Sequence, residues 1–134
     1  MPTEVEIILR LLLATGLGAI IGYERELAKK PAGFRTHLLV CLGATIFTLT
    51  SIYGFGDGVD PSRVAAGVVA GVGFLGAGTI IRTREGLVVG LTTAASIWAV
   101  AAIGLASGAG MYILAAVATL IILVTLRFPW PRGR

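Results

Sequence analysis

The chain has 134 residues, of which 56% are hydrophobic and only 13% are charged. Soluble domains carry about 25% charged residues, so this chain has too few polar side chains to cover a soluble globule, and we expect lipid to solvate much of its surface. The net charge of +4 excludes no partner by itself. A nucleic-acid site needs its basic stripe on an aqueous face, however, so we expect contact with anionic lipid headgroups and not with nucleic acid.

Five apolar segments follow one another along the chain, and each has roughly the 20 residues that a 30 Å hydrocarbon core requires. They cover residues 5–23, 36–53, 61–81, 91–107 and 111–126. Only Gly108, Ala109 and Gly110 separate the last two, which therefore form either a tight hairpin or one long broken helix. We favour the hairpin, because the two together are too long for one crossing. The sequence thus predicts an all-α membrane bundle of five transmembrane helices, with residues 1–134 as one domain.

The basic residues are distributed unevenly between these segments. With five crossings, every basic cluster lies on one side of the membrane and only Arg10 and Arg63 lie on the other, together with Asp57 and Asp60. This is the positive-inside pattern, and it predicts the N-terminus outside and the C-terminus in the cytoplasm. The clustered residues are Arg25, Lys29, Lys30 and Arg35, then Arg82 and Arg84, then Arg127, Arg132 and Arg134.

Glycine is the second strong signal, with 19 residues in the chain. Small residues four apart let helices approach closely in lipid, either within one chain or between two copies. A unit of five helices is too small to enclose a pore alone, so we expect a homo-oligomer and favour a dimer. The pairs with this spacing are Gly18 and Gly22, Gly67 and Gly71, Gly86 and Gly90, and Gly104 and Gly108.

The third segment holds a dense run of glycines at positions 71, 73, 76 and 78. The letters match a dinucleotide-binding fingerprint, but that motif needs a strand before it and an acidic residue about twenty positions later, and this run lies inside a predicted span. Two interpretations stay open. The segment either packs closely against a neighbour, or it is kinked or unwound and lines a cavity with its carbonyl groups.

A cation path has few candidate ligands. None of the seven acidic residues lies in the middle of a predicted span, whereas Mg²⁺ prefers oxygen ligands and ion-coupled carriers usually bury an ionisable side chain. Arg10, about one turn deep, is expected to pair with Glu6 and to extend outward. Trp98 lies near the middle of the fourth segment, where it either packs on a glycine face or lines a pocket. The candidates for an ion path or a helix break are Asp60, Arg63, Gly71, Gly73, Gly76, Gly78, Thr92, Thr93 and Trp98.

The loop after the first segment is the richest group of charged residues. Headgroup binding needs only Lys and Arg, so carboxylates among them indicate an ion-paired cluster or a surface that docks a partner. His37 is the only histidine in the sequence. It either senses pH or forms ordinary hydrogen bonds at the membrane interface. No nucleophile, base and orienting acid assemble from this chain, so we expect no enzyme, no resident cofactor and no assigned metal site. The loop residues are Glu24, Arg25, Glu26, Lys30, Arg35, Thr36 and His37.

Three motifs in order resemble those of the MgtC/SapB family. They are GYERE at 22–26 with KPAGFRTH at 30–37, then DPSRVAAG at 60–67 with GVGFLGAG at 71–78, and GLTTAASIW at 90–98. The resemblance implies a bacterial inner-membrane protein linked to growth in low magnesium and, in pathogens, to virulence. It covers the transmembrane part, since many members carry a soluble domain after the last span and this sequence ends at Arg134. Members often have Gln where Gly67 stands, which weakens a ligand role for that span.

Two functions follow as expectations. The chain is either a regulatory and binding subunit that docks on another membrane complex such as an ATPase, as the resemblance implies for some members, or a component of a Mg²⁺ transporter or channel. The lack of an intramembrane carboxylate favours the first function. The family's association with magnesium keeps the second open.

Overall fold

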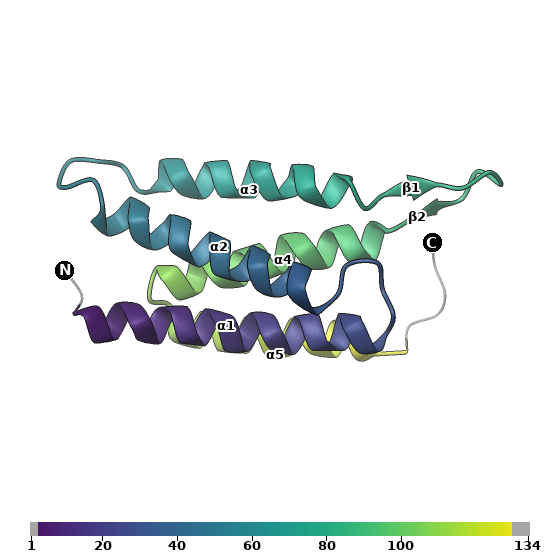
Figure 1. The fold of residues 1–134 in the computed structure, drawn as a ribbon, viewed down its shortest axis with the longest axis horizontal. Helices are drawn as coiled ribbons and strands as arrows, with labels where there is room; N and C mark the ends of the chain where they lie inside the picture. Colours follow the sequence, from purple (N-terminus) through teal and green to yellow (C-terminus); the bar gives the residue numbers. More distant parts are fainter. Residues whose placement is uncertain (1–2, 130–134) are drawn as a thin grey trace.

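The computed structural model describes residues 3–129, which form a bundle of five helices and one short β-hairpin (Figure 1). Successive helices run in opposite directions along the long axis of the molecule. The helices are α1 (Glu4–Leu27), α2 (Phe34–Tyr53), α3 (Ser62–Ala77), α4 (Leu91–Gly108) and α5 (Tyr112–Arg127), and the strands are β1 (Ile81–Arg82) and β2 (Val88–Val89).

The helical lengths agree with a membrane protein. Helices α1, α2 and α4 are long and apolar enough to cross a bilayer. Helices α3 and α5 are also apolar, but each has 16 residues, which is about 24 Å of helix and less than the 30 Å core. The all-helical prediction is confirmed, and the crossing of the membrane by all five helices stays a prediction.

Helix α2 lies at the centre of the bundle and packs most extensively on α1 and α4. Helix α5 packs on α1 and α4, whereas α3 lies at the edge, mainly against α4 (Figure 1). Only Val68 and Gly76 of α3 are buried. The main core therefore belongs to the other four helices, and it contains Ala14, Ile21, Cys41, Val100, Ile103, Ala106 and Ala115.

Two of the glycine pairs bring helices together within the chain. A Cβ atom at Gly18 would lie 2.8 Å from the Cβ of Cys41, and one at Gly104 would overlap the carbonyl oxygen of Cys41. Gly22 and Gly108 make similarly close approaches to α2. The expectation of close packing is confirmed for these four positions, where α1 and α4 each contact α2 through glycine.

The prediction for residues 61–81 was wrong at its inner end. Helix α3 stops at Ala77, and the chain continues into the antiparallel hairpin, in which Ile81 pairs with Val89. Gly86 and Gly90 are therefore not a helical pair; both adopt positive φ, 84° and 93°, at the hairpin turn and at the start of α4. The physical reason is that apolar composition does not distinguish a short strand from the last turn of a helix.

The tight hairpin between the last two segments is confirmed. Helix α4 ends at Gly108, the N–H of Met111 donates to the carbonyl oxygen of Ala106 at 2.9 Å, and Gly110 has φ +80°. This pattern closes a helix with a left-handed residue, which glycine adopts without strain. The interpretation as one long broken helix does not hold.

Candidate functional site

Most of the basic residues gather at one end of the bundle. The end where α1 finishes and α2 begins, which we call the basic end, carries exposed Lys and Arg side chains, whereas the opposite end carries Glu4, Glu6, Asp57 and Asp60 (Figure 1). Arg132 and Arg134 lie outside the described residues. The exposed side chains of the basic end are Lys29, Lys30, Arg35, Arg82, Arg84 and Arg127.

Glu24 and Arg25 form a buried ion pair just inside the basic end. Arg25 is 2% exposed and Glu24 6%, and Arg25 Nε donates to Glu24 Oε1 at 2.6 Å. Within residues 3–129, Arg25 Nη1 is buried and has no hydrogen-bond partner. The ion-paired interpretation of these two residues therefore agrees with the geometry. Their burial leaves little surface for contact with a partner.

The loop between α1 and α2 is held by its own backbone and by Glu26. The N–H of Lys30 donates to the carbonyl oxygen of Arg25 at 3.1 Å, with Lys29 at φ +57°. Glu26 Oε1 accepts a hydrogen bond from the N–H of Phe34 at 2.9 Å, which satisfies a free donor at the start of α2. These contacts fix the position from which Lys30 points into solvent.

His37 joins the start of α2 to α4 and is completely buried. Its Nδ1 lies 2.9 Å from the carbonyl oxygen of Gly33, which only accepts, so Nδ1 carries the proton and donates. Its Nε2 lies 2.8 Å from Ser96 Oγ, which in turn lies 2.9 Å from the carbonyl oxygen of Thr93. These bonds suit the interfacial hydrogen-bonding role; a role in pH sensing stays untested.

The opposite end contains a second polar cluster, centred on Arg10, that the sequence did not reveal. Arg10 Nε pairs with Glu6 Oε2 at 3.3 Å, as expected. The guanidinium also donates through Nη1 to the carbonyl oxygen of Gly108 at 2.9 Å and to the hydroxyl of Tyr53 at 3.1 Å. Arg10 thus links α1 to the outer ends of α2 and α4, which agrees with the expectation that its side chain extends outward. The two interfacial tyrosines, Tyr53 and Tyr112, were the available signal for this cluster, because both hydroxyls lie within 3.4 Å of the guanidinium.

Asp60 and Arg63 are exposed at the start of α3. Asp60 Oδ1 accepts from the hydroxyl of Ser62 at 2.7 Å and from its N–H at 2.9 Å, and these bonds lower the pKa of the Asp60 carboxyl. The Asp60 side chain thus holds the first residue of the helix, which begins at Ser62, one residue later than expected, with Pro61 as its N-cap residue.

Helix α3 passes through its glycine run without a break. Gly71 and Gly73 lie inside the continuous helix, and a Cβ atom on either would meet nothing within 4 Å. Gly76 does pack closely, since its added Cβ would lie 3.2 Å from the carbonyl oxygen of Ala94, and Gly78 follows the helix end. Of the two interpretations, the unwound helix was wrong, and close packing holds only at Gly76.

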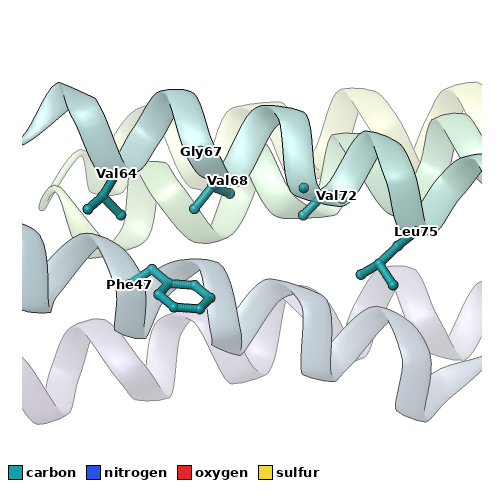
Figure 2. A pocket seen from close by; sticks show the side chains of 7 residues that line it. Phe47, Val64, Gly67, Val68, Val72 and Leu75 are labelled. Atoms are coloured by element: carbon teal, nitrogen blue, oxygen red, sulfur yellow. The ribbon is translucent and has the colours of Figure 1, made fainter.

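An apolar groove of about 470 Å³ runs between α2 and α3. Figure 2 shows Val64, Val68, Val72 and Leu75 pointing from α3 toward α2, with Phe47 facing them from α2. Gly67 and Gly71 also line this groove, which we call the α2–α3 groove.

The remaining ion-path candidates are not brought together. Thr92 is exposed and lines a hollow between α4 and α5, whereas its neighbour Thr93 is buried. Trp98 is 54% exposed and lines two hollows, one between α4 and α3 and one between α4 and α5, neither of which is lined by glycine. Asp60 lies at the opposite end of the bundle from Thr92 (Figure 1). Among the described residues, no three His, Cys, Asp or Glu side chains are grouped so that they could hold a metal ion.

Comparison with known proteins identifies the family. The model of the MgtC family matches residues 11–131. The chain belongs to the MgtC family. Its MgtC-family relatives include the putative magnesium transporter YhiD of Escherichia coli K12, which is 50% identical over 128 residues, or 88% of this chain and 59% of that protein.

Two further MgtC-family relatives have similar coverage. Protein MgtC of Salmonella typhimurium is 50% identical over 117 residues, covering 87% of this chain and 49% of that protein. Protein SapB of Bacillus subtilis is 42% identical over 133 residues, covering 93% of this chain and 57% of that protein. The chain thus spans about half to three-fifths of the length of these relatives. No solved structure matches it.

Proposed function

We propose that this MgtC-family chain is a regulatory subunit of bacterial magnesium homeostasis, embedded in the inner membrane with its basic end in the cytoplasm. The family and the name of the YhiD relative support the link to magnesium. The positive-inside pattern supports the orientation. The role needs neither catalysis nor a resident cofactor, because it rests on binding to another protein.

The observation that carries this proposal is the position of the charged groups inside the bundle. The partly buried Arg10 lies at one end, and the buried Glu24, Arg25 and His37 lie at the other. Between them lies an apolar core around Cys41. Mg²⁺ dehydrates reluctantly and keeps oxygen ligands, so an apolar middle suits a structural frame better than a cation path through one copy.

The hydroxyl groups in this middle region are already engaged. Thr48 Oγ1 donates to the carbonyl oxygen of Ala44 at 2.7 Å, and Ser107 Oγ donates to that of Ile103 at 2.8 Å. Thr45 Oγ1 lies 2.9 Å from the carbonyl oxygens of both Cys41 and Gly104. Such bonds compete with any role as a cation ligand and support the same preference.

The docking surface is then the exposed part of the loop, and not the buried pair. Lys30, Arg35 and Thr36 are exposed, and the contacts of Glu26 with Phe34 and of His37 with Ser96 hold them in place. An acidic cytoplasmic face of another membrane complex, such as a cation ATPase, is the kind of partner that this surface complements.

The loop surface is tested by growth in low magnesium of a strain that depends on this chain. We expect Lys30→Gln with Arg35→Gln to abolish growth while the amount of protein in the membrane stays unchanged. The matched control is Arg84→Gln with Arg127→Gln, which removes the same charge from other exposed positions at the same end and should leave growth intact. An equal loss of growth with both pairs of substitutions would indicate that the basic residues act only by attracting lipid headgroups, and it would contradict a docking surface.

A second function, Mg²⁺ transport, is favoured by the name of the YhiD relative. Purified protein in liposomes separates the two functions, and for a regulatory subunit we expect no protein-dependent Mg²⁺ uptake. Uptake that requires the protein and disappears in Thr92→Val with Thr93→Val would reverse our ranking.

A further inference from the structure

We propose that α3 pairs with α3 of a second copy of this chain across the α2–α3 groove, forming a parallel dimer. The inference goes beyond the proposed function, because it holds whether the assembly regulates another complex or conducts a cation. Three features carry it: the use of the glycine pairs, the shape of the groove and the charges at its outer end.

The helical glycine pairs show what this motif does in the chain. Gly18 with Gly22 and Gly104 with Gly108 each receive another helix at distances that leave no room for a Cβ atom. In the third helical pair, a Cβ atom added at Gly67 or at Gly71 would meet nothing within 4 Å. Two of the three helical pairs therefore pack against another helix of the chain, and the third pair has no helix against it.

The groove has the character of a helix-packing surface. Its seven lining residues are all apolar. Phe47, which lies opposite Val64 and Val68, is 61% exposed, and Leu75, at the other end of the groove, is 58% exposed (Figure 2). Where α3 lines it, the two glycines remove side-chain bulk, so that a second backbone could approach α3 closely. A helix from another copy would fill this space and gain the dispersion contacts that the groove lacks.

Charge complementarity selects a second copy as the occupant. Arg63 is exposed in the first turn of α3, four residues before Gly67 and so on the side of the helix that carries Gly67 and Gly71. Asp60, also exposed, lies just before the helix begins. In a parallel two-fold pair, Arg63 of each copy approaches Asp60 of the other, so that two equivalent ion pairs form. An antiparallel pair would need one copy inverted in the membrane, against the positive-inside pattern. A two-fold arrangement uses the groove of both copies and closes at the dimer.

Self-association is measured by energy transfer between labelled chains in liposomes as the lipid-to-protein ratio is raised. Gly67→Leu and Gly71→Leu should each weaken dimerisation by at least about tenfold, which corresponds to about 1.4 kcal/mol. The matched control is Gly73→Leu, which changes the same residue type in the same helix, also meets nothing within 4 Å and does not line the groove. It should change dimerisation by less than about twofold.

A mixing experiment tests the charges without relying on the groove. Chains with Arg63→Glu and chains with Asp60→Lys should each associate poorly with themselves, because both charges at the contact then have one sign. Mixed together they should associate, since each copy supplies the complement of the other. Thermal unfolding in micelles checks that every variant folds.

Three results would overturn the proposal. The first is a native chain that stays monomeric at every lipid ratio. The second is an equal effect of Gly73→Leu and Gly67→Leu, which would place the contact elsewhere. The third is unchanged energy transfer in Gly67→Leu together with loss of a co-purified phospholipid by mass spectrometry, which would assign the groove to an acyl chain.

Discussion

At the scale of single residues, the buried ion pair at the basic end has the largest consequence. Arg25 and Glu24 are both nearly inaccessible, and Arg25 Nη1 is without a partner in the described part of the chain. Charges in such a position are retained only because each neutralises the other. Removing one partner leaves an uncompensated buried charge and destabilises the fold. Removing an exposed charge such as that of Lys30 changes the free energy of unfolding little.

We therefore expect Glu24→Gln to lower the free energy of unfolding by about 3–5 kcal/mol. Glu24→Gln with Arg25→Gln should cost less than the sum of the single changes, because no buried charge remains. The measurement is unfolding in mixed micelles followed by circular dichroism. Lys30→Gln, the exposed control, should stay within about 0.5 kcal/mol of the native chain. Equal stability of Glu24→Gln and Lys30→Gln would show that the pair is not buried as described.

At the scale of helices, glycine has opposite effects at different positions. On the contact faces of α1 and α4, the absence of a side chain sets how closely those helices approach α2. On the exposed side of α1, Gly16 meets nothing within 4 Å and only adds conformational entropy to the unfolded chain. Sequence spacing alone separates these cases poorly, because it does not identify which face meets a neighbour.

The same substitution at two positions should change stability with opposite sign. Gly104→Ala would place a methyl group on the carbonyl oxygen of Cys41, and we expect it to destabilise the bundle by about 1–3 kcal/mol through overpacking. Gly16→Ala should stabilise it by about 0.5–1 kcal/mol, because alanine is the better helix former. Thermal unfolding of both variants in one detergent makes the comparison. A neutral effect at Gly104 would mean that α4 moves away from α2 at little cost.

At the scale of the whole molecule, the gathering of basic residues at one end predicts how the bundle lies in a membrane. The basic end and the opposite end lie at the two ends of the long axis along which the helices run (Figure 1). Exposed positions at the two ends, such as Lys30 and Asp57, should therefore lie in different compartments.

Cysteine labelling tests this orientation. An impermeant maleimide should label Lys30→Cys only from the cytoplasmic side and Asp57→Cys only from the outside, in intact cells compared with inverted vesicles. The native Cys41 is completely buried, so its background labelling should be low. Labelling of both positions from one compartment would refute the predicted topology and the proposals that depend on it.

The sequence by itself determined the helical membrane character, the approximate positions of all five helices, the hairpin after α4 and the family. These properties follow from composition, segment length and local motifs, which act over a few residues. It also indicated either an ion-paired cluster or a docking surface around Glu24 and Arg25, because acidic and basic residues alternate there.

Only the tertiary structure decided which of these residues are buried and which glycines are in close contact with another helix. The end of α3 at Ala77, the contacts of Arg10 with Tyr53 and Gly108, and the open face at Gly67 all depend on the neighbours that other helices supply. In a chain that is apolar almost throughout, the hydrophobic pattern does not mark an inner and an outer helix face. Which face meets protein is set by the packing of small residues, and that is a property of helix pairs.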